Sequence, residues 1–101
     1  MKILVRRSGG FAGVSETLHD VDTHQIGGAA AAELERLVLD VESAERARSD
    51  KDRPAGADFF AFEITLTDRN GERTIIIPDD GSAPAALAHE LLDALSRLAH
   101  R

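Results

Sequence analysis

The 101-residue sequence has no cysteine, no tryptophan and no tyrosine, and only three prolines. Without cysteine, neither a disulfide nor a thiolate zinc site can form. Aromatic residues make up 4% of the chain, and all of them are phenylalanine. No basic stripe with interleaved aromatic residues appears, which is the pattern typical of nucleic-acid-binding surfaces. These absences exclude a disulfide-stabilised scaffold and argue against a nucleic-acid partner.

Positive charge is also scarce, with 12 Lys and Arg against 18 Asp and Glu and a net charge of −6. A molecule of this charge repels a phosphate backbone. The N-terminal segment is the exception, because Lys2, Arg6 and Arg7 make it basic. We therefore predict one local basic patch that attracts an acidic partner.

Long hydrophobic runs are missing as well. The apolar residues at the N-terminus are flanked by Lys2 and Arg6, so neither a signal peptide nor a membrane span is predicted. We expect a cytoplasmic protein with no membrane partner. Hydrophobic residues form 43% of the chain. Its length and composition predict a single domain over residues 1–101 with a core of its own.

The first half of the chain predicts two strands and a helix. Residues 2–8 form a strand that ends at glycines, and residues 14–22 form an irregular edge strand. On that strand, Val14, Glu16, Leu18 and Asp20 are expected to share a face. Residues 29–41 predict a helix whose apolar residues recur at spacings of three and four. The polar segment 42–57 predicts a solvated connection with at most a frayed helical turn near residues 44–48.

Just before that helix the signals conflict. Asp22-Thr23 could cap a helix, but Gly27-Gly28 argues against one there.

The second half predicts a hairpin and a helix. Residues 58–67 form a strand, and Asp68-Arg69-Asn70-Gly71 supplies a tight turn with positive φ. Residues 72–77 form the second strand of the hairpin. A final helix begins after Ser82. One face of the first strand is expected to hold Phe60, Phe62, Ile64 and Leu66, and the helix stripe to hold Leu87, Leu91, Leu92, Leu95 and Leu98.

Together these elements predict an α+β fold. It has a four-stranded antiparallel sheet of two hairpins with two amphipathic helices on one face, in the order ββαββα.

No catalytic constellation stands out. The segment His89-Glu90-Leu91-Leu92-Asp93 begins like the zinc motif H-E-x-x-H, but Asp93 replaces the second histidine, which favours a surface histidine. No G-x-S-x-G elbow is present, and no lysine follows the glycine-rich segment as a phosphate loop requires. We predict a protein that is not an enzyme and that uses no cofactor and no metal.

The most distinctive segment is residues 7–13, which places three glycines around one phenylalanine. Glycine is favoured where the backbone needs positive φ or must approach another surface closely. Two interpretations stay open. Either Phe11 folds back into the core near Phe60 or Phe62, or the segment is a probe offered to a partner.

The segment, followed by the rest of the chain, resembles the emfourin family of small protein inhibitors of protealysin and other thermolysin-like metalloproteases. Leu34-Glu35-Arg36-Leu37-Val38 resembles a helical segment of that family, and the hairpin to Thr74-Ile75-Ile76-Ile77-Pro78-Asp79 resembles its second half. Residues 24–28 and 44–53 depart from the family's pattern, and either departure would alter the choice of partner.

The resemblance implies an inhibitor that blocks the active-site cleft of a thermolysin-like zinc metalloprotease. The implied partner-binding residues are Arg7, Ser8, Gly9, Gly10, Phe11, Ala12 and Gly13. The alternative is a protein-protein interaction module that uses the same segment or the edge strand 14–22 without inhibiting a protease. A small enzyme or ligand-binding domain is the weakest hypothesis. A monomer is expected, although a dimer paired through the edge strand is conceivable.

Overall fold

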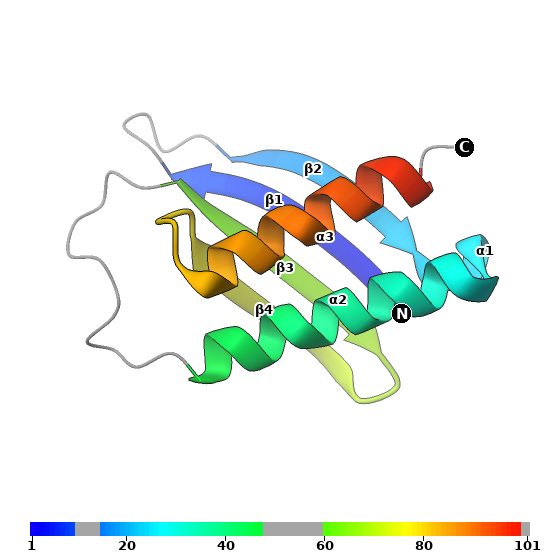
Figure 1. Ribbon diagram of the computed structural model, residues 1–101. Helices are drawn as coiled ribbons and strands as arrows, with labels where there is room; N and C mark the ends of the chain where they lie inside the picture. The colour runs from blue at the N-terminus through cyan, green and yellow to red at the C-terminus, as the bar shows by residue number, and fades with distance from the viewer. Residues whose placement is uncertain (10–14, 48–59, 100–101) are drawn as a thin grey trace.

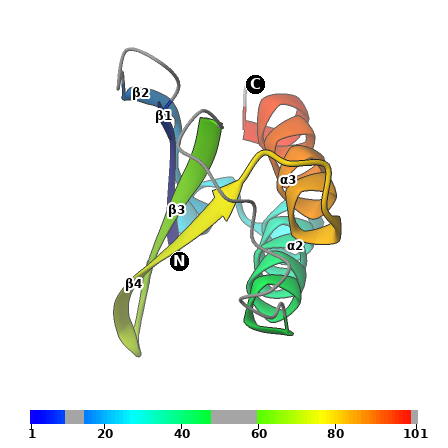
Figure 2. The same ribbon diagram turned by 90° about the vertical axis from the view of Figure 1, so that its left-hand side faces the viewer.

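The structure is a computed structural model that describes residues 1–9, 15–47 and 60–99. A four-stranded antiparallel sheet forms one layer, and two long helices lie side by side on one of its faces (Figures 1 and 2). The elements are β1 (Lys2–Gly9), β2 (Glu16–Asp22), α1 (Thr23–Ile26), α2 (Gly28–Ala47), β3 (Phe60–Asp68), β4 (Gly71–Pro78) and α3 (Ala83–Ala99). The predicted α+β fold and its order ββαββα are confirmed, with the one-turn helix α1 in addition.

The strand order is β2-β1-β3-β4, so β1 and β3 are central and the predicted edge position of the second strand is confirmed. Ile3 of β1 lies between Val21 of β2 and Leu66 of β3. The β3–β4 hairpin turns as predicted, but its positive φ of 110° falls on Gly71 alone.

The core lies between the sheet and the two long helices. Its fully buried large apolar side chains come from strands β1, β3 and β4 and from helices α2 and α3. They are Ile3, Val5, Leu34, Val38, Val41, Ile64, Leu66, Ile77, Leu91 and Leu95. The predicted stripe on the last helix is confirmed at its centre, whereas Leu87, Leu92 and Leu98 are only partly buried. None of the helices in the described ranges is both long and apolar enough to cross a membrane.

The predicted alternation of β2 is wrong at one point. The pairing shifts between Val5, which faces His19, and Arg6, which faces Thr17, so Leu18 is an extra residue in β2. One extra residue reverses the parity of the side chains that follow it. As a result, Leu18 and Val21 both pack against the core, although strict alternation predicts opposite faces for them.

Helix α2 runs six residues further than predicted. Residues 42–47, assigned from the sequence to a solvated connection, continue the helix because their charges have partners. Arg73 of β4 binds Glu42, because its Nε donates to Glu42 Oε2 at 2.5 Å. Arg46, one turn further along the helix, has its Nη2 3.8 Å from the same oxygen. Residues 48–57 lie outside the described residues.

Arg73 also bridges to the β3–β4 turn, where its Nη1 lies 3.1 Å from Asp68 Oδ2. The hydrogen bonds that Arg73 donates to Glu42 and then to Asp68 raise its pKa above the usual range. The pKa of Asp68 is lowered, chiefly by the backbone N–H of Asn70 and then by Arg73. This ion triad joins α2 to the hairpin.

Helix α1 resolves the conflict between cap and glycine signals. Asp22 Oδ1 accepts from the His24 N–H at 3.0 Å, and Gly27 ends the helix with φ 70° after one turn. Thr23 is buried, and its hydroxyl donates to Glu35 Oε2 on α2 at 2.7 Å. The cap at Asp22 and the glycine at position 27 are thus both used, one at each end of this four-residue helix.

Candidate partner-binding end of the sheet

Three of the seven predicted site residues, Arg7, Ser8 and Gly9, are the last residues of β1. Gly10, Phe11, Ala12 and Gly13 lie outside the described residues, so the two interpretations of Phe11 stay open. Gly9 has φ 99°, a backbone conformation that glycine adopts without strain, and it pairs with Phe60 of β3. Strand β1 therefore holds the first three residues of the segment 7–13 in a fixed position.

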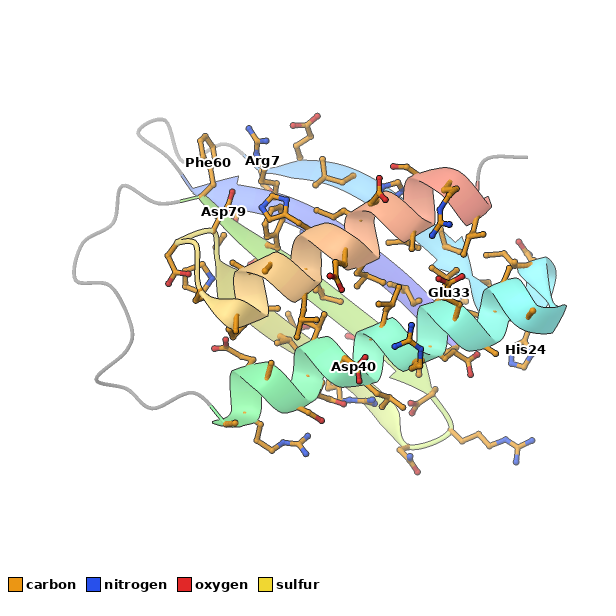
Figure 3. The ribbon with its side chains drawn as sticks, viewed as in Figure 1. Arg7, His24, Glu33, Asp40, Phe60 and Asp79 are labelled. Carbon is orange, nitrogen blue, oxygen red and sulfur yellow. The ribbon has the colours of Figure 1, made fainter. Side chains whose placement is uncertain are left out.

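We call this end of the sheet the loop end, and define it by Arg7, Ser8, Gly9, Phe60 and Asp79. Figure 3 shows Arg7, Phe60 and Asp79 gathered there, while His24 and Glu33 lie toward the other end of the molecule.

The predicted basic patch is divided between the two faces of the sheet. Arg7 pairs with Phe62, on the face that carries the helices, and Arg6 pairs with Glu63, on the open face. Neighbouring residues of a strand point to opposite faces, so the two guanidinium groups cannot act together. Arg6 Nη2 donates to Ser15 Oγ at 2.6 Å, beside the start of β2. Of these two arginines, Arg7 is the one on the helix-bearing face of the loop end.

Phe60 is the largest departure from the predicted core. Along β3 the exposed fraction is 0% at Leu66, 1% at Ile64 and 3% at Phe62, and then rises to 42% at Phe60. Alternation puts Phe60 on the core face as predicted, but it lies at the end of the strand, where its neighbours no longer cover it. The guanidinium carbon of Arg7 lies 4.3 Å from the centre of its ring, a cation–π contact.

The backbone of Phe60 is held from the opposite side by the corner between β4 and α3. The Asp79 N–H donates to the Phe60 carbonyl at 2.8 Å. Asp79 Oδ1 lies 2.9 Å from His89 Nε2, and the His89 ring meets Phe62 edge-on, with centroids 5.2 Å apart. His89 is thus the surface histidine that the sequence favours, and it contacts Asp79 and Phe62.

Among residues 1–9, 15–47 and 60–99 no group of three or more histidine or acidic side chains is placed to hold a metal ion. His19 Nε2 and Ser96 Oγ lie 3.4 Å apart, at the long limit of a hydrogen bond. A shallow groove between β2 and α1 is lined by Asp20, Val21, Asp22, Gln25 and Ile26. Neither feature brings together an activated nucleophile and its base.

The Phe60–Arg7 stack and the Asp79–His89 pair could not be found from the sequence. Arg7 and Phe60 are 53 positions apart, and only the register of β1 against β3 brings them together. The sequence places Phe60 inside a strand predicted over residues 58–67, and only the structure shows it to be the first residue of β3.

Comparison with protein-family models finds a match to the Emfourin family over residues 5–96, which covers all of β2, α1, α2, β3 and β4 and most of α3, and begins within β1. The chain belongs to the emfourin family. No curated protein and no solved structure matches it significantly. Emfourins are inhibitors of proteases, so the family places this chain among inhibitors and implies a metalloprotease partner.

Proposed function

We propose that this emfourin inhibits a thermolysin-like zinc metalloprotease by occupying its active-site cleft with residues 7–13. The observation that carries the proposal is the family match, whose range contains the whole segment. The described part of the segment supports it. Arg7, Ser8 and Gly9 are the last residues of the central strand β1, so the sheet fixes the start of the segment. That the encounter takes place in the cytoplasm stays a prediction from the sequence.

The chemistry of residues 7–13 favours occlusion of the cleft over capture of the zinc ion. The segment contains no histidine, cysteine or carboxylate, the side chains that bind zinc. It offers instead one large apolar side chain, Phe11, and glycines that let the backbone approach a partner closely. Proteases of this class cleave before bulky apolar residues, so their clefts contain an apolar pocket of suitable size for a phenylalanine side chain.

Burial of one such side chain contributes roughly 1.5–3 kcal/mol. Tight inhibition therefore needs further contacts besides Phe11.

The test is inhibition of peptide hydrolysis by a purified thermolysin-like protease, with the wild-type chain, Phe11→Ala and Gly10→Val. We expect competitive inhibition by the wild type and, for Phe11→Ala, a rise in Ki of about tenfold to a hundredfold. Leu39→Ala is the matched control, because Leu39 is 51% exposed on α2. If both loop variants inhibit as well as the wild type, residues 7–13 are not the inhibitory element.

The alternative, an interaction module that inhibits no protease, keeps one specific observation in its favour, since β2 is an edge strand. A wild-type chain that leaves several thermolysin-like proteases fully active would favour it.

A further inference from the structure

We infer that the stacked pair Phe60 and Arg7 is a second contact of the inhibitor, which binds a carboxylate beside an apolar patch on the rim of the protease cleft. The inference rests on the proposed function and extends it to a residue outside the segment 7–13. Three observations carry it, namely the exposure of Phe60, the stacking of Arg7 and the rigid support beneath them.

The first observation is an aromatic side chain, Phe60, that the core leaves 42% exposed. Phe60 is one of three large hydrophobic side chains in the described residues that are markedly exposed, with Leu39 and Ile76. Leu39 lies on the outer side of α2 and Ile76 on the open face of the sheet, opposite Glu63. Phe60 alone of the three lies at the loop end, where it pairs with Gly9. A partner that binds the glycine-rich segment therefore also meets this ring.

The second observation gives the chemistry of the partner. Arg7 lies with its guanidinium 4.3 Å from the centre of the Phe60 ring. A guanidinium above an aromatic ring keeps its charge and N–H donors, which bind a carboxylate through charge-assisted hydrogen bonds. No carboxylate that the structure describes forms an ion pair with Arg7, and Glu16, its neighbour across the β1–β2 pair, is not within pairing distance. The pair thus presents an aromatic ring with one cation above it.

The third observation is pre-organisation. The Phe60 backbone is fixed by Gly9 on one side and by the Asp79 N–H on the other, and Asp79 is held in turn by His89. Little conformational entropy is lost when such a side chain is covered, so more of the contact energy appears as affinity. Arginine and aromatic residues on a fixed scaffold are the residue types enriched among binding hot spots.

The experiment measures Ki for the wild type, Phe60→Ala, Arg7→Gln and the double variant against a thermolysin-like protease. Ile76→Ala is the matched control, because Ile76 is 52% exposed but lies on the opposite face. We expect Phe60→Ala to raise Ki by about tenfold or more and Ile76→Ala by less than about twofold. The double variant should raise Ki by less than the product of the two single effects, because the two side chains act together.

A second measurement does not depend on the folding of a Phe60 variant. The chain has no cysteine, so Glu16→Cys introduces a single thiol at the position paired with Arg7, and Ile76→Cys introduces one on the far face. We expect saturation with the protease to slow alkylation of the first thiol severalfold and to leave the second unchanged.

The outcomes separate the two proposals. If the wild type inhibits and Phe11→Ala weakens it, but Phe60→Ala and Arg7→Gln leave Ki unchanged and the thiol at position 16 stays reactive, this inference is wrong and the proposed function stands. If the wild type does not inhibit, the proposed function fails and the inference falls with it.

Discussion

At the scale of single residues, the buried hydroxyl of Thr23 should contribute measurably to stability. Thr23 is 1% exposed and donates to Glu35 Oε2 at 2.7 Å, which links the start of α1 to α2. Thr23→Val keeps the shape of the side chain and removes the donor. We expect a loss of about 1 kcal/mol in the free energy of unfolding, measured by urea denaturation. Thr17→Val, at an exposed position of β2, is the control and should have little effect. Equal stabilities of the two variants would contradict this role of Thr23.

A second prediction at this scale concerns Asp68 and pH. The pKa of its carboxyl is lowered in the folded protein by the Asn70 N–H and by Arg73. The ionised form therefore stabilises the fold, fully above the unfolded pKa of about 3.9, and this contribution disappears as the pH falls through the folded value. We expect Asp68→Asn to lower the urea midpoint at neutral pH and to have no effect in strong acid.

Asp40→Asn provides the comparison for that experiment. Asp40 pairs with Arg36 one turn away on α2, and both side chains are about half exposed or more. Such a pair contributes about 0.5 kcal/mol or less. A midpoint shift for Asp68→Asn that is the same in acid as at neutral pH would show that the carboxylate charge is not the cause.

The spacing of apolar residues predicted the buried faces of the two long helices well, because that spacing indicates which side chains a helix turns toward the core. It failed at Phe60, since alternation gives the face of a side chain and not the place where the covering helices end. It also missed the Asp79–His89 pair. Their contact depends on how the corner between β4 and α3 turns, and no local pattern encodes that turn.

At the scale of elements, α2 should depend on its inner face and tolerate changes on its outer face. Leu34 is fully buried and Leu39 is 51% exposed on the same helix, and both are leucines. We expect Leu34→Ala to cost about 2–5 kcal/mol, by the loss of buried surface and the cavity left behind. Leu39→Ala should change stability by less than about 0.5 kcal/mol. Thermal and urea denaturation of the two variants provide the measurement, and similar losses for both would show that the packing face of α2 is assigned wrongly.

The elements also show where sequence reasoning reaches its limit. The end of α2 looked like a connection because residues 42–47 are mostly polar. Glu42 is held there by Arg73, 31 positions along the chain, and such tertiary partners override local propensity. The bulge at Leu18 escaped prediction for a similar reason, since it appears only in the register of β2 against β1.

At the scale of the whole molecule, the sheet leaves β2 open at one edge, and the charges on that edge oppose self-pairing. If two copies paired antiparallel about His19, each Glu16 would lie opposite Asp22 of the other copy, and each Leu18 opposite Asp20. Like charges directly opposite one another in a sheet are destabilising. Charged side chains on edge strands are a common protection against such association.

We therefore expect a monomer of 10.9 kDa in sedimentation experiments at high micromolar concentration and ordinary salt. Molar salt screens the opposing carboxylates, so any sheet-paired dimer should appear there first. A dimer that persists at low salt would contradict this prediction and would mean that the edge is matched by some other register. The distinction bears on inhibition, because the loop end lies at the end of β1, beside this same edge. A monomer leaves the outer edge of β2 uncovered, whereas a dimer paired through β2 would place a second copy beside Glu16, the residue paired with Arg7, and narrow the approach of the protease.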